Sequence, residues 1–264
     1  MASNSKPPLE RLLAIMARLR DRQNGCDWDI AQTFETIAPY TIEEAYEVDD
    51  AIARGDLASL KDELGDLLFQ VVFHSRIAEE AGHFAFEDVV RTISDKMESR
   101  HPHIFGNETA DDQRREERWE RIKAEERAAK GAARTLDGIA LALPALLRAE
   151  KLQKRAARCG FDWPDVTGPM DKLAEETEEL AAANSATERF EEAGDLLFAA
   201  VNVVRAYGIQ AEDALRAANR KFERRFQAME SLAELRGLAF NELSLDEQEA
   251  LWVAVKASET AKPS

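Results

Sequence analysis

Residues 40–77 read "YTIEEAYEVDDAIARGDLASLKDELGDLLFQVVFHSRI". Within this segment Glu63 and Asp66 lead directly into a run of six apolar residues that is typical of a protein core: Leu67, Leu68, Phe69, Val71, Val72 and Phe73. A closely similar segment, "EEAGDLLFAAVNVV", recurs at residues 191–204. Carboxylates are rarely buried unless they are paired or bound to a cation. Two such segments in one chain therefore indicate a chemical role for the acids.

The composition favours an all-α protein. The chain has 264 residues, 45% hydrophobic and 33% charged, with only twelve glycines, eight prolines and few β-branched runs. Leu9, Leu12, Leu13, Met16 and Leu19 recur at helical spacing. Further helices are expected at about 41–54, 58–80, 86–99, 111–129, 144–158, 170–183, 187–207, 211–235 and 245–257. This length suits one large domain or two of ordinary size.

The charge and the apolar pattern narrow the class of partner. A formal net charge of −16 disfavours nucleic-acid binding, although a phosphorylated small molecule can still bind where cations gather. No apolar stretch approaches the ~20 residues that a membrane helix needs. The first ten residues contain no apolar signal region. We therefore expect a cytoplasmic protein that contacts neither nucleic acid nor membrane.

The chain repeats itself. Four segments recur in the same order: "NGCDWD" (24–29) as "CGFDWP" (159–164), "EEAYE" (43–47) as "EETEE" (175–179), "DELGDLLFQVV" (62–72) as "EEAGDLLFAAV" (191–201), and "DKMESR" (95–100) as "RKFERR" (220–225). A repeat of this kind indicates duplication of one structural unit. We predict two helical units, residues 9–125 and 143–257, each with a four-helix-bundle site.

The acids of each copy are spaced to share one helix face. In the first copy Glu44 and Glu47 are three residues apart, and so are Glu63 and Asp66 on the next helix. The short link "RGDLAS" makes the two helices antiparallel neighbours, so that the carboxylates face one another. Gly65 is expected to let another helix approach. The second copy has Glu176, Glu179, Glu192 and Asp195, with Gly194 in the place of Gly65.

Four facing carboxylates cannot all stay charged without compensation. Two charges ~5 Å apart repel by roughly 3 kcal/mol at an effective dielectric constant of 20, so six pairs cost up to about 20 kcal/mol. That exceeds the net stability of a whole domain, ~5–15 kcal/mol. Either protons remain bound or cations bind. All-oxygen ligands favour Mg²⁺ first and Mn²⁺ second.

Basic residues follow the acids in each copy. Lys221 and Arg225 lie four apart in "NRKFERRF" (219–226), and Lys96 and Arg100 are their first-copy equivalents. Surface salt bridging would explain this spacing equally well. Cations beside carboxylate-bound Mg²⁺ are, however, what a polyphosphate ester requires. The sequence has no GxxxxGK[ST] phosphate-binding loop, so metal ions would make most of the phosphate contacts.

Two other classes of protein remain open at this point. A di-iron bundle would require paired ExxH motifs, and the one match, Glu80 to His83, has no counterpart in the second copy. A non-catalytic interaction protein would not need acids at a core boundary, which is where we expect Asp66 and Asp195. Both classes are therefore less favoured than a metal-dependent phosphate chemistry.

These motifs resemble the MazG family of nucleoside triphosphate pyrophosphohydrolases. The family pattern, EExxE followed by ExxD, stands at residues 43–47 with 63–66 and again at 175–179 with 192–195. The resemblance runs from "RLLAIMARLRDRQNGCDWD" to "LWVAVK" and includes the tandem arrangement of the bacterial two-domain members. One departure is Asp27, where "GCPWD" is usual; we expect a turn there, so the departure should not affect the chemistry.

The resemblance implies an all-α homodimer that uses Mg²⁺ to cleave NTPs and dNTPs, ATP among them, to the monophosphate and pyrophosphate. The implied metal ligands are Glu176, Glu179, Glu192 and Asp195, with a second, N-terminal site at Glu44, Glu47, Glu63 and Asp66. The implied nucleotide-binding residues are Lys172, Glu191, Lys221, Arg225 and Trp252. The implied catalytic residues are Glu175, Glu176 and Lys221, with Glu175 or Glu176 orienting or deprotonating the water that attacks the α-phosphorus.

The resemblance also implies that the C-terminal copy is the active one and that the first copy contributes to the dimer. Only the second copy is followed by the helix that carries Trp252, and its basic helix has Arg224 where the first copy has Ser99. Trp252 would also be compatible with a plain core position. Base and sugar preference stay open.

Overall fold

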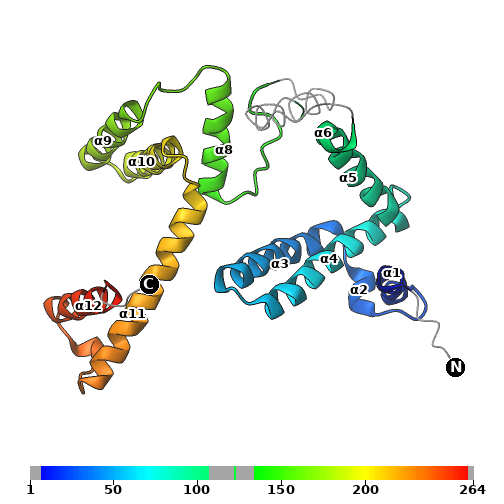
Figure 1. Cartoon of the computed structure of the whole chain (residues 1–264), viewed down its shortest axis with the longest axis horizontal. Coiled ribbons are helices and arrows are strands. Elements are labelled where there is room, and N and C mark those ends of the chain that lie inside the picture. The colour runs from blue at the N-terminus through cyan, green and yellow to red at the C-terminus, as the bar shows by residue number, and fades with distance from the viewer. Residues whose placement is uncertain (1–6, 107–121, 123–133, 261–264) are drawn as a thin grey trace. The chain divides into compact units, whose positions relative to one another are not determined.

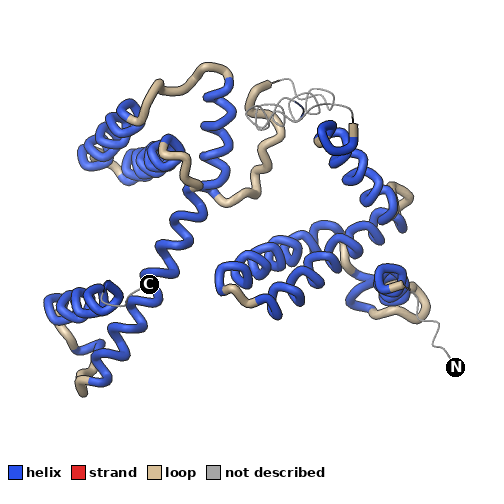
Figure 2. Tube along the Cα trace, in the orientation of Figure 1, coloured by secondary structure: helices blue, strands red, loops and turns tan. Residues whose placement is uncertain are grey.

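The computed structural model describes residues 7–106, Ile122 and residues 134–260, with the side chain of Thr260 excepted. These residues form helices and connecting loops, with no strand among them, which confirms the all-α prediction (Figures 1 and 2). The chain divides into two compact units, residues 1–122 and 123–264. The helix predicted at 111–129 lies outside the described residues. No described helix is both long enough and apolar enough to cross a membrane.

The first unit is built around a long helical hairpin (Figure 1). Its helices are α1 (Pro8–Leu19), α2 (Asp27–Ala31), α3 (Phe34–Arg54), α4 (Leu57–Glu80), α5 (Phe86–Arg100) and α6 (Pro102–Phe105). Helices α3 and α4 pack along each other, and α1 and α5 pack against α4. The core of the unit consists of Met16, Ile37, Val72, Phe73 and Ile77.

Local signals explain where the hairpin turns. Gly55 ends α3 with a left-handed backbone, φ 69°, which glycine adopts without steric cost. Asp56 then caps α4 by accepting hydrogen bonds from the backbone N–H groups of Ala58 and Ser59. At its other end α3 begins at Phe34, seven residues earlier than expected. Thr33 forms a capping box there, and the helix tolerates an internal proline.

The second unit repeats the hairpin and adds a long arm. Its elements are α8 (Ala145–Arg158), α9 (Thr167–Ala182), α10 (Ala186–Ala206), α11 (Ala211–Leu235), η2 (Phe240–Glu242) and α12 (Leu245–Thr260). Helices α9 and α10 pair as α3 and α4 do, and α8 packs on α10 and α11. A second core of Met229, Ala233, Leu251 and Val255 joins α12 to the C-terminal half of α11. Figure 1 shows this α11–α12 arm reaching away from α9 and α10.

The structure of the single chain contradicts three of our expectations about the helices that carry the acids. Only part of the apolar run in α4 is buried, because Leu68 and Val71 remain exposed on a face that no described element covers. Asp66 and Asp195 are exposed rather than set at a core boundary. Gly65 and Gly194 face open space among the described residues, because a β-carbon added at either position would have no described neighbour within 4 Å, so no described helix approaches them. Helix periodicity located the hairpins but not the face that packs.

Candidate active site

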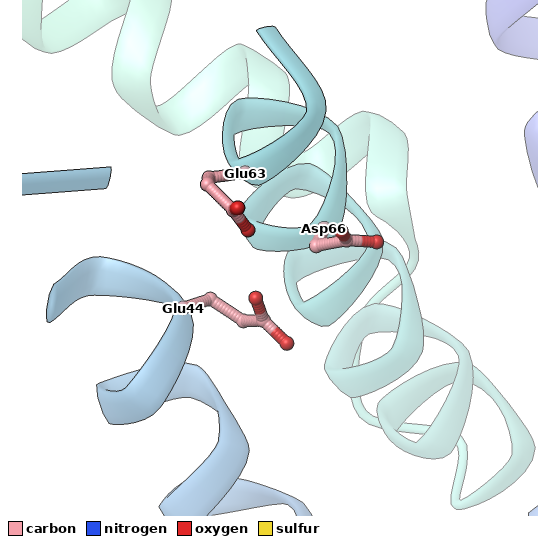
Figure 3. A group of neighbouring side chains, drawn as sticks. All are labelled: Glu44, Glu63 and Asp66. Carbon is pink, nitrogen blue, oxygen red and sulfur yellow. The ribbon is translucent and has the colours of Figure 1, made fainter. Parts of the chain in front are cut away.

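The hairpin of the first unit brings three acids together. One carboxylate oxygen from each of Glu44, Glu63 and Asp66 lies within 4.8 Å of the other two. Figure 3 shows Glu44 reaching from α3 toward Glu63 and Asp66 on α4. Glu47, the fourth acid of the motif, lies outside this group of three but is close enough to raise the pKa of both Glu44 and Glu63.

The second unit makes the same kind of cluster from a different subset of the motif. Here the three acids within 4.8 Å are Glu176, Glu179 and Glu192. Asp195 lies outside the group of three but close to it, since it raises the pKa of Glu192 and lines a cavity with Glu176. Each unit therefore gathers three of its four predicted ligands, and the fourth lies beside them.

Both clusters resist full ionisation. Partial desolvation raises the pKa of Glu192, and the charges of Glu179 and Glu176 raise it further. In the first unit desolvation raises the pKa of Glu44, and the charge of Asp66 adds to the effect. A divalent cation would reverse these shifts, because an opposite charge favours the ionised form.

Lys172 distinguishes the second cluster from the first. Its Nζ lies 2.8 Å from Oε1 of Glu175 and 2.6 Å from Oε1 of Glu176, so one ammonium holds both acids. These two hydrogen bonds raise the pKa of Lys172 above its usual range, which keeps the lysine charged. The equivalent position in the first copy is Tyr40, which cannot supply a fixed positive charge.

The residues of the second cluster fit a hard divalent cation. Glu176 is only 4% exposed, and its Oε2 accepts no hydrogen bond from the described residues. A buried carboxylate oxygen without a donor is costly unless something positive binds it. The possible metal-ligand atoms of this cluster are all carboxylate oxygens, which suit Mg²⁺ or Mn²⁺.

The predicted nucleotide-binding residues fall into two groups. Lys172 lies in the acid cluster, and Glu191 lies next to it, where its charge contributes to the raised pKa of Glu192. Arg225 and Trp252 lie together on the α11–α12 arm, with the guanidinium 5.5 Å from the ring centroid. A single chain does not bring that arm to the acids (Figure 1).

The arm carries its own ion pairs and ring contacts. Glu259 accepts hydrogen bonds from Arg225 at 2.8 Å and from Arg224 at 3.1 Å. The rings of Phe222 and Trp252 lie 5.7 Å apart between centroids. Lys221 is exposed and forms no ion pair among the described residues. Trp252 is thus half-buried in an aromatic cluster and is not a fully buried core residue.

The rival ExxH motif is not a metal site in this fold. Glu80 accepts hydrogen bonds from the buried guanidinium of Arg20, at 2.8 Å, and from Arg76, also at 2.8 Å. Both of its oxygens are therefore engaged in ion pairs. His83 follows the end of α4 and belongs to neither acid cluster. This arrangement removes the main structural support for a di-iron protein.

A cavity beside the second cluster was not expected. It lies between α8, α9 and α10, has a volume of about 510 Å³, and is lined at one end by Lys172, Glu176 and Asp195. Its other walls include Gln153, Trp163, Phe198 and Asn202. The repeat contained a signal for it, because Asn202 occupies the position that Phe73 holds in the first copy. A core position that changes from Phe to Asn between repeats indicates a change of environment.

The fold and the clusters define an all-α protein with paired carboxylate sites suited to a divalent cation. The sequence profile described as "MazG nucleotide pyrophosphohydrolase domain" matches residues 32–105 and again 167–229, one match in each unit. The chain belongs to this family, in the tandem two-domain form, and is an enzyme of the pyrophosphohydrolase class.

Two curated relatives extend over almost the full chain, and a third covers part of it. A nucleoside triphosphate pyrophosphohydrolase of Escherichia coli (strain K12) is 51% identical over 257 residues, covering 95% of this chain and 98% of the relative. The nucleoside triphosphate pyrophosphohydrolase/pyrophosphatase MazG of Thermotoga maritima is 43% identical over 250 residues, covering 95% and 96%. A nucleoside triphosphate pyrophosphohydrolase of Mycobacterium tuberculosis is 37% identical over 154 residues, covering 58% and 46%.

Proposed function

We propose that this chain hydrolyses nucleoside and deoxynucleoside triphosphates at the α-phosphorus, with Mg²⁺ as its cofactor. The products are the nucleoside monophosphate and pyrophosphate. The observation that carries the proposal is the second acid cluster, in which a buried carboxylate has an unpartnered oxygen beside a lysine that holds its other oxygen. The relatives named as nucleoside triphosphate pyrophosphohydrolases support the same substrate class.

The acids of the second unit have two proposed roles, metal binding and activation of water. Glu176, Glu179, Glu192 and Asp195 would hold the cation, which supplies charge neutralisation and Lewis acidity to the phosphate oxygens. Glu175 is exposed and keeps one carboxylate oxygen clear of Lys172, so it orients or deprotonates the attacking water. The water oxygen bonds to the α-phosphorus as the bond from that phosphorus to the bridging oxygen breaks. Pyrophosphate leaves with the electron pair.

The second unit is the active one in this proposal. Lys172 holds its acids, whereas the first copy has Tyr40 at that position. The second unit also has the α11–α12 arm with Arg225 and Trp252. We assign the repeats to residues 9–125 and 143–257, with the first copy contributing mainly to assembly.

We further propose a homodimer. In α4 the residues Leu57, Leu64, Leu68 and Val71 form an exposed stripe along one helix face. In α10 the exposed residues Phe190 and Leu197 lie seven apart, again on one face. Exposed apolar side chains aligned on one helix face indicate a protein interface. A second copy of the chain would cover these faces by a two-fold symmetric contact.

The reaction is tested by its products. We expect purified protein with Mg²⁺ to convert each of the eight common NTPs and dNTPs that it accepts into monophosphate and intact pyrophosphate, identified by ion-exchange chromatography. Water enriched in ¹⁸O should label the monophosphate and leave the pyrophosphate unlabelled, because the attack is on the α-phosphorus. Release of nucleoside diphosphate and orthophosphate would contradict the assignment of the attacked atom.

Metal binding is tested through stability. Mg²⁺ at about 100 times its dissociation constant stabilises the state that binds it by about 2.7 kcal/mol. For a chain of this size we expect the melting temperature to rise by roughly 5–10 °C. Asp195→Asn should reduce the rise and abolish turnover. The matched variant Asp66→Asn should retain turnover, and an undiminished rise in Asp195→Asn would show that Asp195 is not a ligand.

A further inference from the structure

A buried glutamate on α8 binds the first backbone N–H group of α11. Glu150 is only 3% exposed. Its Oε2 accepts a hydrogen bond from the N–H of Ala211, the first residue of α11, at 3.1 Å. Its Oε1 accepts a hydrogen bond from Nζ of Lys154 at 2.6 Å. Both carboxylate oxygens therefore have a partner, and one of the two partners belongs to another helix.

The charge of Glu150 is compensated by the start of that other helix. Burial of a carboxylate is unfavourable unless hydrogen bonds and opposite charge replace the lost water. The positive end of the α11 helix dipole and the ammonium of Lys154 provide this compensation. The N-cap residue of α11, Gln210, forms no side-chain cap hydrogen bond. Glu150 therefore acts as an N-terminal cap that is supplied by a different helix.

The turn that leads into α11 does little to fix the direction of the helix. Residues 207–210 join α10 to α11, and all four are exposed. Gly208 within this turn has a left-handed backbone, φ 73°. An exposed turn contributes few packing contacts that would set the angle between two helices. Ala211 is 6% exposed, so α11 becomes buried at the residue whose N–H group Glu150 accepts.

Helix α8 is itself tied to the hairpin that carries the acids. Nε2 of Gln153 donates a hydrogen bond to the backbone carbonyl of Phe198 on α10 at 2.8 Å. Gln153 is 7% exposed and lies one turn after Glu150 on α8. Helix α8 thus connects α10, which carries two of the proposed metal ligands, to α11, which carries Lys221.

The first unit has no acid at the corresponding position. Ile15 occupies the place of Glu150 relative to the repeated motif that contains Trp28 or Trp163, and it is 42% exposed. The start of α5 is capped locally, since the N–H of Ala85 donates to Oδ2 of Asp88 at 3.0 Å. A cavity of about 490 Å³ lies between α1, α4 and α5. The cap from another helix therefore accompanies the unit whose basic helix carries Lys221.

We propose that Glu150 is a positioning residue, which fixes the direction of α11 and thereby the place of Lys221 at the substrate phosphates. The proposal rests on the proposed function, because Lys221 has its role in that reaction. Lys221 lies ten residues after Ala211, roughly 15 Å along the helix at about 1.5 Å per residue. A tilt of about 10° at Ala211 would move Lys221 by roughly 2.6 Å. A displacement of ~1 Å at the reacting groups can already lower a rate by about 100-fold.

The direction of α11 can be measured independently of activity. Nitroxide labels are placed on cysteines introduced at two exposed positions, Thr187 on α10 and Gln227 on α11. The full chain is used, with the exposed Cys26 and Cys159 replaced by serine. Labelled chains are mixed with an excess of unlabelled chains, so that pulsed electron–electron double resonance reports the distance within one chain. We expect a narrow distance distribution when Glu150 is present.

Variants of Glu150 separate the length of the side chain from its charge. Glu150→Asp keeps the charge but withdraws the carboxylate from Ala211 by one methylene, so the distribution should broaden, as it should in Glu150→Ala. Glu150→Gln keeps the length and an oxygen that accepts the N–H of Ala211, so the distribution should stay narrow. Asp88→Ala removes the local cap of α5 in the first unit and is the matched control. It should leave the distribution unchanged.

Kinetics show whether Glu150 acts through Lys221. Glu150→Ala should lower kcat/KM by about 10- to 1,000-fold, up to the effect of Lys221→Ala. In a Lys221→Ala background it should cause no further loss beyond about twofold, because residues that act as one unit are not additive. Glu150→Gln and Asp88→Ala should retain most of the parental kcat/KM. The Mg²⁺-dependent rise in melting temperature should persist in all these variants, because the acids lie on α9 and α10.

A parental distance distribution in both Glu150→Ala and Glu150→Asp would overturn the proposal. An equal fall in kcat/KM with and without Lys221 would do the same, because the effect of Glu150 would then not pass through the lysine. If Glu150→Ala does not fold, Glu150→Asp decides both measurements. A protein that shows the expected distance changes but releases no pyrophosphate would support the anchoring of α11 and refute the proposed reaction.

Discussion

Glu179→Gln is expected to lower turnover of nucleoside triphosphate by roughly 100- to 1,000-fold, the loss typical of removing one electrostatic contact to a transition state. Glu179 is one of the three acids whose oxygens lie within 4.8 Å of one another in the second unit. A neutral amide is a far poorer ligand for Mg²⁺ than a carboxylate. The measurement is the steady-state release of pyrophosphate at saturating Mg²⁺.

The matched control is Glu47→Gln, the same motif position in the first copy. We expect it to retain most of the turnover, because the first copy lacks the lysine that holds the acids of the second. Glu47 raises the pKa of Glu44 and Glu63, so removing its charge relieves repulsion and should not destabilise the fold. If Glu47→Gln were folded and dimeric yet as inactive as Glu179→Gln, the assignment of the active unit would be wrong.

Lys221→Ala is expected to lower kcat/KM by about 10- to 1,000-fold through lost neutralisation of phosphate charge in the transition state. Lys221 is exposed on α11 and forms no ion pair among the described residues, so its removal should cost little stability. Thermal unfolding with and without Mg²⁺ separates the two effects. A melting temperature like that of the parent, together with the fall in kcat/KM, is the expected pair of results.

Mixing variants shows which chain supplies Lys221. A single chain does not bring the α11–α12 arm to the acids of α9 and α10 (Figure 1). In a two-fold dimer the lysine would therefore act on the acids of the partner. Random exchange of Glu179→Gln with Lys221→Ala protomers should then restore roughly a quarter of the parental activity, since one of two sites in each mixed dimer is intact. No recovery in verified mixed dimers would place both residues in one chain's site.

Much of the fold could be predicted because its signals are local. The glycine and aspartate at 55–56 explain the turn of one hairpin, and the capping box at Ser185 and Glu188 starts α10, the returning helix of the other. The repeat of the motifs predicts equivalent hairpins in both units. Boundaries set by weaker signals were missed, as at the start of α3, where a cap at Thr33 outweighs an internal proline.

Much less of the site could be predicted, because its geometry depends on contacts between helices. Spacing put four acids on facing helix surfaces in each copy, but packing decides which three come within 4.8 Å. The spacing of the motifs predicts neither the exposure of Asp195 nor the ion pair of Arg225 with Glu259. The cavity beside Glu176 required three helices to be placed together.

The sequence by itself determined the class of fold, the tandem repeat and the identity of the acids, because helix period, capping residues and motif spacing act over a few residues. Only the tertiary structure decided that Lys172 holds Glu175 and Glu176, that an oxygen of Glu176 is buried without a donor, and that Asn202 borders a cavity where Phe73 fills a core. These features depend on distances across helix interfaces. Such distances follow from how side chains interlock and not from their order along the chain.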